Sequence, residues 1–306
     1  MSSNDVVEPV LRSIAKAESH IRIEYGTKMV GVMDTIGDHP HFAMMLQPGS
    51  VAVLSGRPDI DTMYKASVDL AAPQASRLLS QRATDWYVFI ENVPTRLWIE
   101  DGSYRTVQTV TMFVTDDENG ITGEYAWQRY YPPDAPSGDG DVPLPERALN
   151  NLQMHQTLMD ALSGGDWETL ESLLDPDCIW AQRMYPGSVE GGEIVDLRSA
   201  ADALAHVRQW HAAVRPDHVI ILNRQVTDWY VFSEELWVVR PDGEEARQYR
   251  VAVVYAVNQA GKIEAALGFG KAMEDLSPTA GQKLGLAFYP DGVGPDPASR
   301  TGYPEG

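Results

Sequence analysis

A hexapeptide that occurs twice limits what this chain can fold into more than any other feature. Residues 84–89 and residues 227–232 both read TDWYVF, an offset of 227 − 84 = 143. The tetrapeptide PGSV at residues 48–51 returns at residues 186–189, an offset of 186 − 48 = 138. Solenoid repeats have much shorter periods, about 20–50 residues. The sequence therefore predicts the duplication of a whole domain.

Two domains also suit the length of 306 residues, because single hydrophobic cores stop growing at about 250–300 residues. The Pro-, Gly- and Asp-rich stretch that starts at Pro132 cannot continue a helix or a strand. We expect a first domain over 1–131, a linker over 132–145, a second domain over 146–276 and a Pro/Gly-rich tail over 277–306. The tail is expected to be either disordered or draped over a neighbour, and its aromatic residues favour the second alternative.

Charge and cysteine content exclude several classes of protein. The formal net charge is −20, and no basic cluster interrupts it, so neither nucleic acid nor an anionic membrane is an expected partner. Cys178 is the only cysteine, which rules out an intramolecular disulfide and a zinc site built from several thiolates. The sequence shows no signal-peptide pattern and no apolar run of about 18 residues. These features favour a cytoplasmic protein.

Apolar spacing in the second half predicts helices first and strands afterwards. The predicted helices cover 146–162, 167–174 and 199–214, and the predicted strands cover 178–180, 218–222, 230–232, 236–239, 249–257 and 263–269. In the first half the predicted elements are a helix to about residue 23, a short helix near 28–36, a strand around residue 44, a helix near 62–79 and then strands. This order predicts an α+β fold with helices packed on one face of a curved antiparallel sheet.

Residues 162–180, LSGGDWETLESLLDPDCIW, resemble the opening of SnoaL-like domains of the nuclear transport factor 2-like superfamily. Residues 259–263, QAGKI, resemble the last hairpin of such domains. The resemblance covers most of the second half, and the repeat extends it to the first, which implies two tandem cone-shaped α+β barrels. It also implies an apolar conical cavity between sheet and helices. Family members include ketosteroid isomerases, dehydratases, an epoxide hydrolase, polyketide cyclases, diarylpropane lyases of lignin breakdown and non-catalytic binding modules.

The isomerases of this family use a Tyr, an Asp base and a neutral acid. Counting from the repeat places these three positions near Leu158, Gln182 and Val253 in the second half. The same count in the first half gives His20, Met44 and either Thr109 or Thr111. Neither half carries the isomerase set, which argues against a simple ketosteroid isomerase.

The first half is the expected catalytic half and the second the structural one. Residues 121–130 form the last strand of the first half, and alternation places Glu124, Ala126, Gln128 and Tyr130 on one face. By the family resemblance that face lines the cavity. The expected counterparts in the second half are Glu264, Ala266, Gly268 and Gly270, which are less polar.

Glu124 is the leading catalytic candidate, because a buried carboxylate is costly unless it has a partner or a task. Lys28 with Tyr25 is the expected electrostatic partner, and His20, His39 and His41 are further acid–base candidates in a region that also holds Asp34 and Asp38. The expected substrate-binding residues are Trp86, Tyr64, Gln128 and Tyr130. The alternatives without a catalytic role are that His20 is a core or surface histidine, that residues 38–41 form a polar turn, and that Trp86 has a structural role.

His39 and His41 share a strand face as metal ligands would, but no third ligand is suitably spaced. The family resemblance implies proteins that mostly work without metal or other cofactor, so none is expected. The 8 Trp and 13 Tyr, without a phosphate-binding loop or a Gly-x-Ser-x-Gly elbow, favour a hydrophobic small-molecule substrate. The leading hypothesis is a cofactor-independent lyase that eliminates water or formaldehyde from a hydrophobic, aromatic compound. The alternatives are an isomerase or cyclase, and a non-catalytic binder of hydrophobic ligands or proteins.

We expect the two halves to pack through their sheets, as separate domains of this type do, and the whole chain to form a homo-oligomer. Light scattering should therefore give a mass above that of one chain. A mass of 33.8 kDa, that of the single chain, would contradict self-association under the conditions used.

Overall fold

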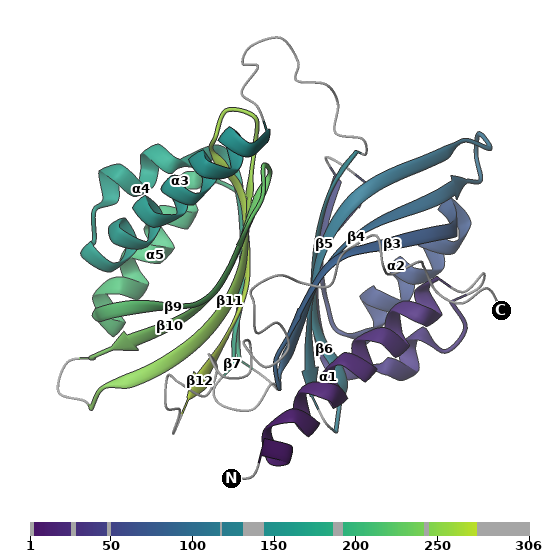
Figure 1. Ribbon diagram of the computed structural model, residues 1–306, viewed down its shortest axis with the longest axis horizontal. Helices are drawn as coiled ribbons and strands as arrows, with labels where there is room; N and C mark the ends of the chain where they lie inside the picture. The colour runs from purple at the N-terminus through teal and green to yellow at the C-terminus, as the bar shows by residue number, and fades with distance from the viewer. Residues whose placement is uncertain are drawn as a thin grey trace. The chain divides into compact units, whose positions relative to one another are not determined.

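The computed structural model describes residues 3–25, 29–47, 50–116, 118–130, 144–185, 192–241 and 245–273 (Figure 1). The described residues up to 130 belong to one compact unit and those from 144 onward to a second. The expected linker up to residue 143 and the whole of the expected tail lie outside the described residues. Each unit is described separately below.

The described residues of the first unit form two α-helices, a short 3-10 helix and six strands. In chain order they are α1 (Ser3–Glu24), η1 (Val32–Thr35), β1 (Ile36–Gln47), β2 (Ser50–Ser55), α2 (Arg57–Leu70), β3 (Ala71–Ala83), β4 (Tyr87–Trp98), β5 (Tyr104–Asp116) and β6 (Gly120–Tyr130). The second unit contains α3 (Leu144–Gly164), α4 (Trp167–Leu173), β7 (Leu174–Tyr185), β8 (Glu193–Leu197), α5 (Ala200–Val214), β9 (Pro216–Val226), β10 (Tyr230–Val239), β11 (Arg247–Val257) and β12 (Ile263–Met273).

Both units have the same sheet topology. The strand order is β2-β1-β6-β5-β4-β3 in the first sheet and β8-β7-β12-β11-β10-β9 in the second. Within each unit the sheet is curved and the helices cover one of its faces (Figure 1). The predicted α+β class and the predicted duplication are therefore confirmed.

The structure corrects three details of the predicted elements. The helix expected over 62–79 ends at Leu70, and β3 follows at once; Pro73 has no backbone N–H and disfavours helix at the residue before it. The short helix expected near 28–36 is the 3-10 turn η1. The sheets are mixed rather than purely antiparallel, because β1 pairs with β6, and β7 with β12, in parallel.

The repeated hexapeptide builds the same turn at the start of β4 and of β10. Thr84 Oγ1 accepts hydrogen bonds from the backbone N–H groups of Trp86 and Tyr87, at 3.4 and 3.3 Å. Thr227 Oγ1 accepts the equivalent bonds from Trp229 and Tyr230, at 3.4 and 3.2 Å. In each copy the Trp ring meets the next Tyr ring edge to face, with centroids 5.2 and 5.1 Å apart. The repeat is thus an architectural element of both halves.

Strand pairing fixes which residues of the two halves correspond. Phe113 pairs with Glu124 in the first sheet, and Tyr255 pairs with Ala266 in the second. Tyr87 pairs with Val114, and Tyr230 with Ala256, so Phe113 and Tyr255 are equivalent. Glu124 therefore corresponds to Ala266, and the equivalence with Glu264 expected from the sequence is off by two residues, one step on the same strand face.

Helix α1 packs on the first sheet through a stripe of residues three or four positions apart, including Ala17 and Ile21. They join Phe42, Ile90 and Phe113 in the first core.

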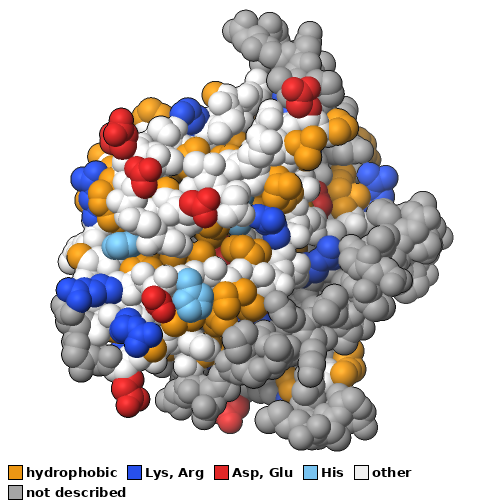
Figure 2. All heavy atoms as spheres, turned by 60° about the vertical axis from the view of Figure 1, so that its left-hand side comes forward, with side chains coloured by type: hydrophobic (Ala, Val, Ile, Leu, Met, Phe, Trp, Pro, Cys, Tyr) orange, Lys and Arg blue, Asp and Glu red, His pale blue; other side chains and the backbone are white. Residues whose placement is uncertain are grey.

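None of the described helices is long and apolar enough to cross a membrane. On the face shown in Figure 2, acidic and basic side chains alternate with hydrophobic ones, and neither charge gathers into one patch.

Replacing either repeated threonine by alanine should destabilise its own half. Thr84→Ala and Thr227→Ala each remove the acceptor of two backbone N–H groups, so each should lower the free energy of unfolding by about 1 kcal/mol. Hydrogen exchange of the amides at the start of β4 and of β10 reports each half separately. The serine variants keep the hydroxyl and should exchange nearly as slowly as the parent; equal loss in the serine and alanine variants would contradict this role.

Candidate active site

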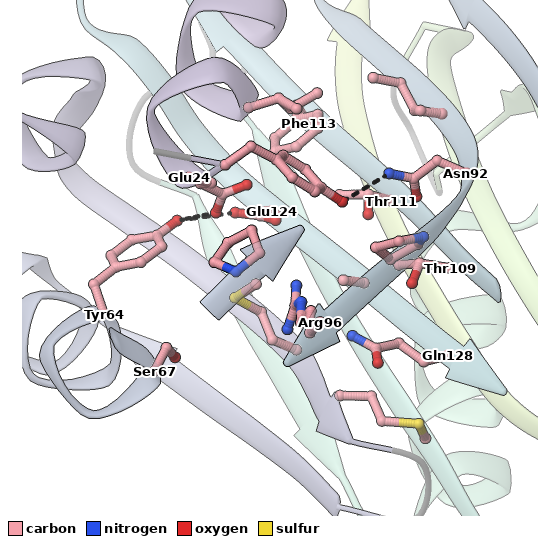
Figure 3. A pocket seen from close by; sticks show the side chains of 18 of the residues that line it. Glu24, Tyr64, Ser67, Asn92, Arg96, Thr109, Thr111, Phe113, Glu124 and Gln128 are labelled. Atoms are coloured by element: carbon pink, nitrogen blue, oxygen red, sulfur yellow. Dashed lines mark hydrogen bonds between the residues drawn. The ribbon is translucent and has the colours of Figure 1, made fainter. Parts of the chain in front are cut away.

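A cavity of about 70 Å³ lies between the helices and the sheet of the first unit (Figure 3). At roughly 15 Å³ per water molecule, it has room for several waters. Its apolar side includes Ile21, Met29, Met44, Met45, Met63 and Phe113. Its polar side includes Glu24, Tyr25, Tyr64, Asn92, Arg96, Thr109, Thr111, Glu124 and Gln128. Methionine side chains adapt easily, so rotamer changes can enlarge the cavity for a larger ligand.

His20 lies directly behind the cavity on α1, with its side chain fully buried. Its Nδ1 is 2.6 Å from Thr35 Oγ1, and that hydroxyl donates its own hydrogen to the carbonyl oxygen of Val32, also at 2.6 Å. The Thr35 oxygen must therefore accept a hydrogen from Nδ1. This bond fixes the ring and turns Nε2 toward the cavity.

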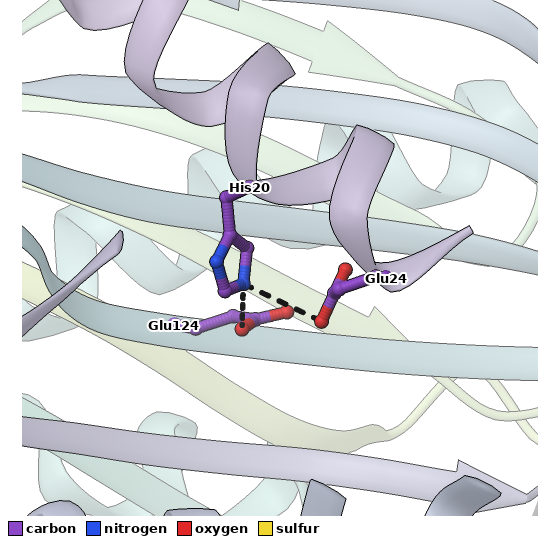
Figure 4. A group of neighbouring side chains, drawn as sticks. All are labelled: His20, Glu24 and Glu124. Carbon is purple, nitrogen blue, oxygen red and sulfur yellow. Dashed lines mark ion pairs between the residues drawn. The ribbon is translucent and has the colours of Figure 1, made fainter. Parts of the chain in front are cut away.

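Two carboxylates lie beside His20 Nε2 (Figure 4), and a phenol completes its surroundings. Glu24 Oε1 is 3.4 Å away, Glu124 Oε2 is 3.6 Å away and the Tyr64 hydroxyl is 3.0 Å away. The Tyr64 hydroxyl donates to Glu24 Oε1 at 2.8 Å. His20 and Glu24 lie one turn apart on α1, whereas Glu124 comes from β6 and Tyr64 from α2. The cluster thus joins three elements that are distant in sequence.

The cluster changes the acidity of each member. Burial alone would lower the pKa of His20, but the negative charge of Glu24 and hydrogen bonds to both carboxylates outweigh it and raise that pKa to about 10. Burial opposes ionisation of Glu24, yet His20 holds the pKa of Glu24 below its usual value. Burial, and then the charge of Glu24, raise the pKa of Glu124 to about 7. Burial and both carboxylates also raise the pKa of Tyr64.

At neutral pH the cluster therefore holds an imidazolium, an ionised Glu24 and a Glu124 that is close to half protonated. A group that binds and releases a proton near the working pH is suited to general acid–base catalysis. Only 3% of the Glu124 side chain is exposed, and the carboxyl borders the cavity. Any proton it exchanges with a bound molecule is shielded from bulk water.

Several residues singled out from the sequence meet at this cavity. Glu124, Tyr25, Tyr64 and Gln128 line it, and His20 contacts two of them from behind. The three first-half positions counted from the isomerase pattern are here too, with Met44, Thr109 and Thr111 in the lining. Lys28 lies outside the described residues.

Other candidates lie away from the cavity. Phe42 of β1 pairs with Glu124, so His41 and His39 point to the opposite face of the sheet. His41 is buried there against Tyr125 and 3.0 Å from Ser55 Oγ, and His39 is exposed. The expectation that these two histidines lie at the cavity is corrected, because alternation along β1 assigns them to the other face.

Trp86 and Tyr130 are also placed differently from the expected substrate contacts. Trp86 is buried against Tyr87 and is not among the residues that line the cavity. Tyr130 shares the cavity-facing side of β6 but is 45% exposed at the strand end, beyond the lining. Asp34 and Asp38 border a separate surface groove with Lys16 and Glu118.

Glu24, Asn92 and Arg96 line the cavity and were missed in the sequence. The signal for Glu24 was its spacing of four residues from His20, which places both on one helix face. The signal for the other two was alternation along β4, where Asn92 and Arg96 continue the face of the apolar Val88 and Ile90. A polar residue in an inward-facing position of a strand needs a partner or a task.

His20, Glu24 and Glu124 also have the donor types that divalent cations accept, and one ligand atom from each lies within 4.8 Å of the others. The expectation of no metal considered only His39 and His41. A proton on His20 Nε2 and a metal ion at the same nitrogen exclude each other. The geometry fits both occupants, and the raised pKa of His20 favours the proton.

The corresponding region of the second half is packed differently. His155 contacts the ring of Tyr255 as His20 contacts that of Phe113, with centroids 5.5 and 5.6 Å apart. Glu235 accepts hydrogen bonds from Trp237 Nε1 at 2.7 Å and from the Tyr255 hydroxyl at 3.1 Å. The positions of Glu124, Thr109 and Thr111 are taken by Ala266, Val251 and Val253, which belong to the apolar core. In the second half these positions are therefore apolar, and Glu235 supplies a buried carboxylate.

Comparison with known proteins gives a family for the second half. A family model described as a SnoaL-like domain matches residues 155–266. No curated protein sequence matches the chain.

Solved structures resemble about half of the chain. An LEH-like epoxide hydrolase of M. tuberculosis is 17% identical, with a TM-score of 0.33 over 45% of this chain and 93% of that one. A protein of Catenulispora acidiphila with a ketosteroid isomerase-like fold is 13% identical, with a TM-score of 0.31 over 41% and 88%. An NTF2-like protein of Anabaena variabilis is 10% identical, with a TM-score of 0.34 over 39% and 90%.

Histidine-selective NMR should show His20 as an imidazolium well above neutral pH, because Glu24 and Glu124 hold its pKa at about 10. A group whose pKa is raised on folding contributes stability below its unfolded pKa of about 6.5 and loses it as pH rises toward 10. In Glu24→Gln the main stabilising charge is gone, so the His20 pKa should fall by more than one unit. A His20 that titrates near 6.5 in the parent protein would contradict the cluster.

Proposed function

Because the chain contains a SnoaL-like domain whose strand order is repeated in its first half, we propose that it is an enzyme that moves protons on a small hydrophobic substrate, with its active site in the first-half cavity. The observation that carries this proposal is the buried Glu124 carboxyl, which borders the cavity with a pKa of about 7. Structural ion pairs can also shift pKa values. Here, however, the shifted group faces an open space.

The proposed proton carrier is Glu124 and the other members of the cluster set its acidity. Ionised Glu124 takes a proton from a carbon or hydroxyl of the substrate and later returns it. The positive charge of His20 keeps Glu24 ionised, and the charge of Glu24 keeps Glu124 basic enough to act near pH 7. Arg96 lines the same cavity and lowers the pKa of Glu24 through its charge. It is positioned to stabilise negative charge that develops on the substrate, the role expected from the sequence for Lys28.

The finer proposal is a cofactor-independent lyase. Loss of water requires a base that removes a proton from carbon and an acid that protonates the departing hydroxyl. Loss of formaldehyde requires a base that removes the hydroxyl proton and an acid that protonates the resulting carbanion. In each case Glu124 removes a proton and delivers it again, so the enzyme returns to its starting state without a redox cofactor. The rings of Tyr25, Tyr64 and Phe113 in the lining suit an aromatic substrate.

An isomerase is the second candidate, because a single carboxyl with a pKa near 7 can return the proton to a different carbon of the same molecule. Product mass separates the two reactions, since elimination lowers the mass of the substrate and isomerisation leaves it unchanged. A non-catalytic binder is less well supported. Its cavity would need no buried carboxyl of perturbed acidity, and burying Glu124 and His20 is costly.

Glu124→Gln should lower kcat by about a hundredfold or more, because general acid–base catalysis is worth about 10²–10⁴. A panel of hydroxylated aryl ketones and arylpropane diols, followed by mass spectrometry in D₂O, reports both deuterium uptake and elimination. If Glu124 acts as the base, kcat/KM of the parent should rise with pH through about 7, since the ionised form is the active one.

The matched control is His211→Ala, which changes a half-buried histidine of α5 in the second half and should leave turnover near the parent value. If Glu124→Gln kept its turnover and His211→Ala lost it, the assignment of the active site to the first half would be wrong. The parent should also keep full activity after exhaustive chelation. Activity that is lost on chelation and restored by a divalent ion would assign His20, Glu24 and Glu124 to a metal instead.

A further inference from the structure

We propose that the ligand of the first-half cavity is a small carboxylate, whose anionic group pairs with Arg96 while its apolar body lies against the methionines. This inference deepens the proposed function by naming its substrate class. It rests on three observations: the state of Arg96, the row of polar atoms in the same cavity and the charge balance of the cavity.

Arg96 lines the cavity without a hydrogen bond or ion pair to any described residue, and its Nε is buried without a partner. Its neighbour across the sheet, Arg105, shows the usual arrangement for an arginine. Arg105 pairs with Asp101 at 2.8 Å and stacks over Trp98 at 4.1 Å. Burying the Nε–H donor of Arg96 without a hydrogen-bond partner is costly, although the half-buried side chain also interacts with Glu24 through its charge. The planar pair of N–H donors of a guanidinium fits the two oxygens of a carboxylate.

A row of polar side chains crosses the sheet and lines the same cavity as Arg96 (Figure 3). Asn92 of β4 pairs with Thr109 of β5, and Thr109 pairs with Gln128 of β6. Asn92 Oδ1 and Thr109 Oγ1 are buried and have no hydrogen-bond partner among the described residues. Unpaired polar atoms that border a cavity are satisfied by a ligand or by water.

The polar row and Glu124 lie at different depths of the cavity. Along β6, Gln128 is four residues from Glu124, roughly 13 Å at about 3.3 Å per residue. The side chains that lie between them, Ile90, Thr111, Ala126 and Met44, are mostly apolar. A ligand whose anion lies at Arg96 therefore extends its apolar body toward the proton carrier.

The charge balance of the cavity favours an anion. The ionisable groups in contact with Glu124 are His20 from α1 and Tyr64 from α2, and Glu24 of α1 acts on it through its charge. Arg96 of β4 and Tyr25 line the same cavity. When Glu124 is protonated, His20 and Arg96 are positive, Glu24 is negative and Tyr64 is neutral. One positive charge is left over, and a bound carboxylate neutralises it. Ionisation of Glu124 removes that excess, so carboxylate binding should favour the protonated form.

The test compares carboxylates with their neutral amides by calorimetry and NMR at pH 6. Butanoate and phenylacetate are the anionic probes, and butanamide and phenylacetamide are the neutral ones. We expect the acids to bind at least about tenfold tighter than the amides, because a charge-assisted pair is worth about 1.5–3 kcal/mol. Arg96→Met should lose this preference, whereas Arg105→Gln, which removes the same charge from the paired position on β5, should keep it.

The pH dependence of binding provides a second readout that does not depend on the Arg96 variant folding. Phenylacetate affinity of the parent should fall as pH rises above 7, and in Glu124→Gln, which stays neutral, the fall should disappear. Equal affinity for acid and amide, no binding of any probe, or a preference that survives in Arg96→Met would overturn the proposal. None of these outcomes tests turnover. A carboxylate site without proton transfer would leave this inference standing and refute the proposed function.

Discussion

The first-half cavity depends on placing two carboxyl groups around one buried imidazole. Either carboxylate alone in that position would be strongly disfavoured, because burial removes the water that stabilises its charge. His20 compensates for Glu24, and Tyr64 adds a hydrogen bond to the same oxygen. Glu124 is compensated only in part, because burial and the charge of Glu24 oppose its ionisation more strongly than His20 and Tyr64 favour it. Glu124 therefore gains and loses its proton near neutral pH, at the surface of the cavity.

The elements that hold this cluster are rigid for reasons unrelated to chemistry. Thr35 fixes His20 through a bond that α1 and η1 supply, and the pairing of β5 with β6 fixes Glu124 opposite Phe113. Catalytic groups on helices and strands are positioned more accurately than groups on loops. The packing of the surrounding core must offset the unfavourable free energy of burying the carboxyl, as is usual where activity and stability compete.

The two halves share their scaffold but differ in the ionisable residues of their interiors. Both halves have the same strand order and the same Thr-capped turn, and both have a buried histidine on the first helix. In the second half Ala266 takes the place of Glu124 and the carboxylate moves to Glu235, where Trp237 and Tyr255 satisfy it. One fold can therefore carry a cluster of ionisable groups beside a cavity in one copy and apolar residues at the same positions in the other.

The sequence alone determined the duplication, the α+β class and the inward face of β6. Repeats and apolar periodicity can be read along the chain, and they predict directly which segments correspond and which residues share a buried face. It also singled out Glu124, since the alternation along the strand shows a carboxylate on an otherwise apolar face. It did not resolve where α2 ends, because apolar residues in 71–79 fit a helix as well as a strand until Pro73 is considered.

Tertiary structure decided which groups form the site. The strand that carries His39 and His41 has two faces, and only its parallel pairing with β6 shows that these histidines point away from the helices. Glu24, Tyr64 and Arg96 come from three elements, and no spacing along the chain indicates that they converge on one cavity. The acidity of Glu124 is likewise a tertiary property, because burial and the charge of a residue one hundred positions earlier set it.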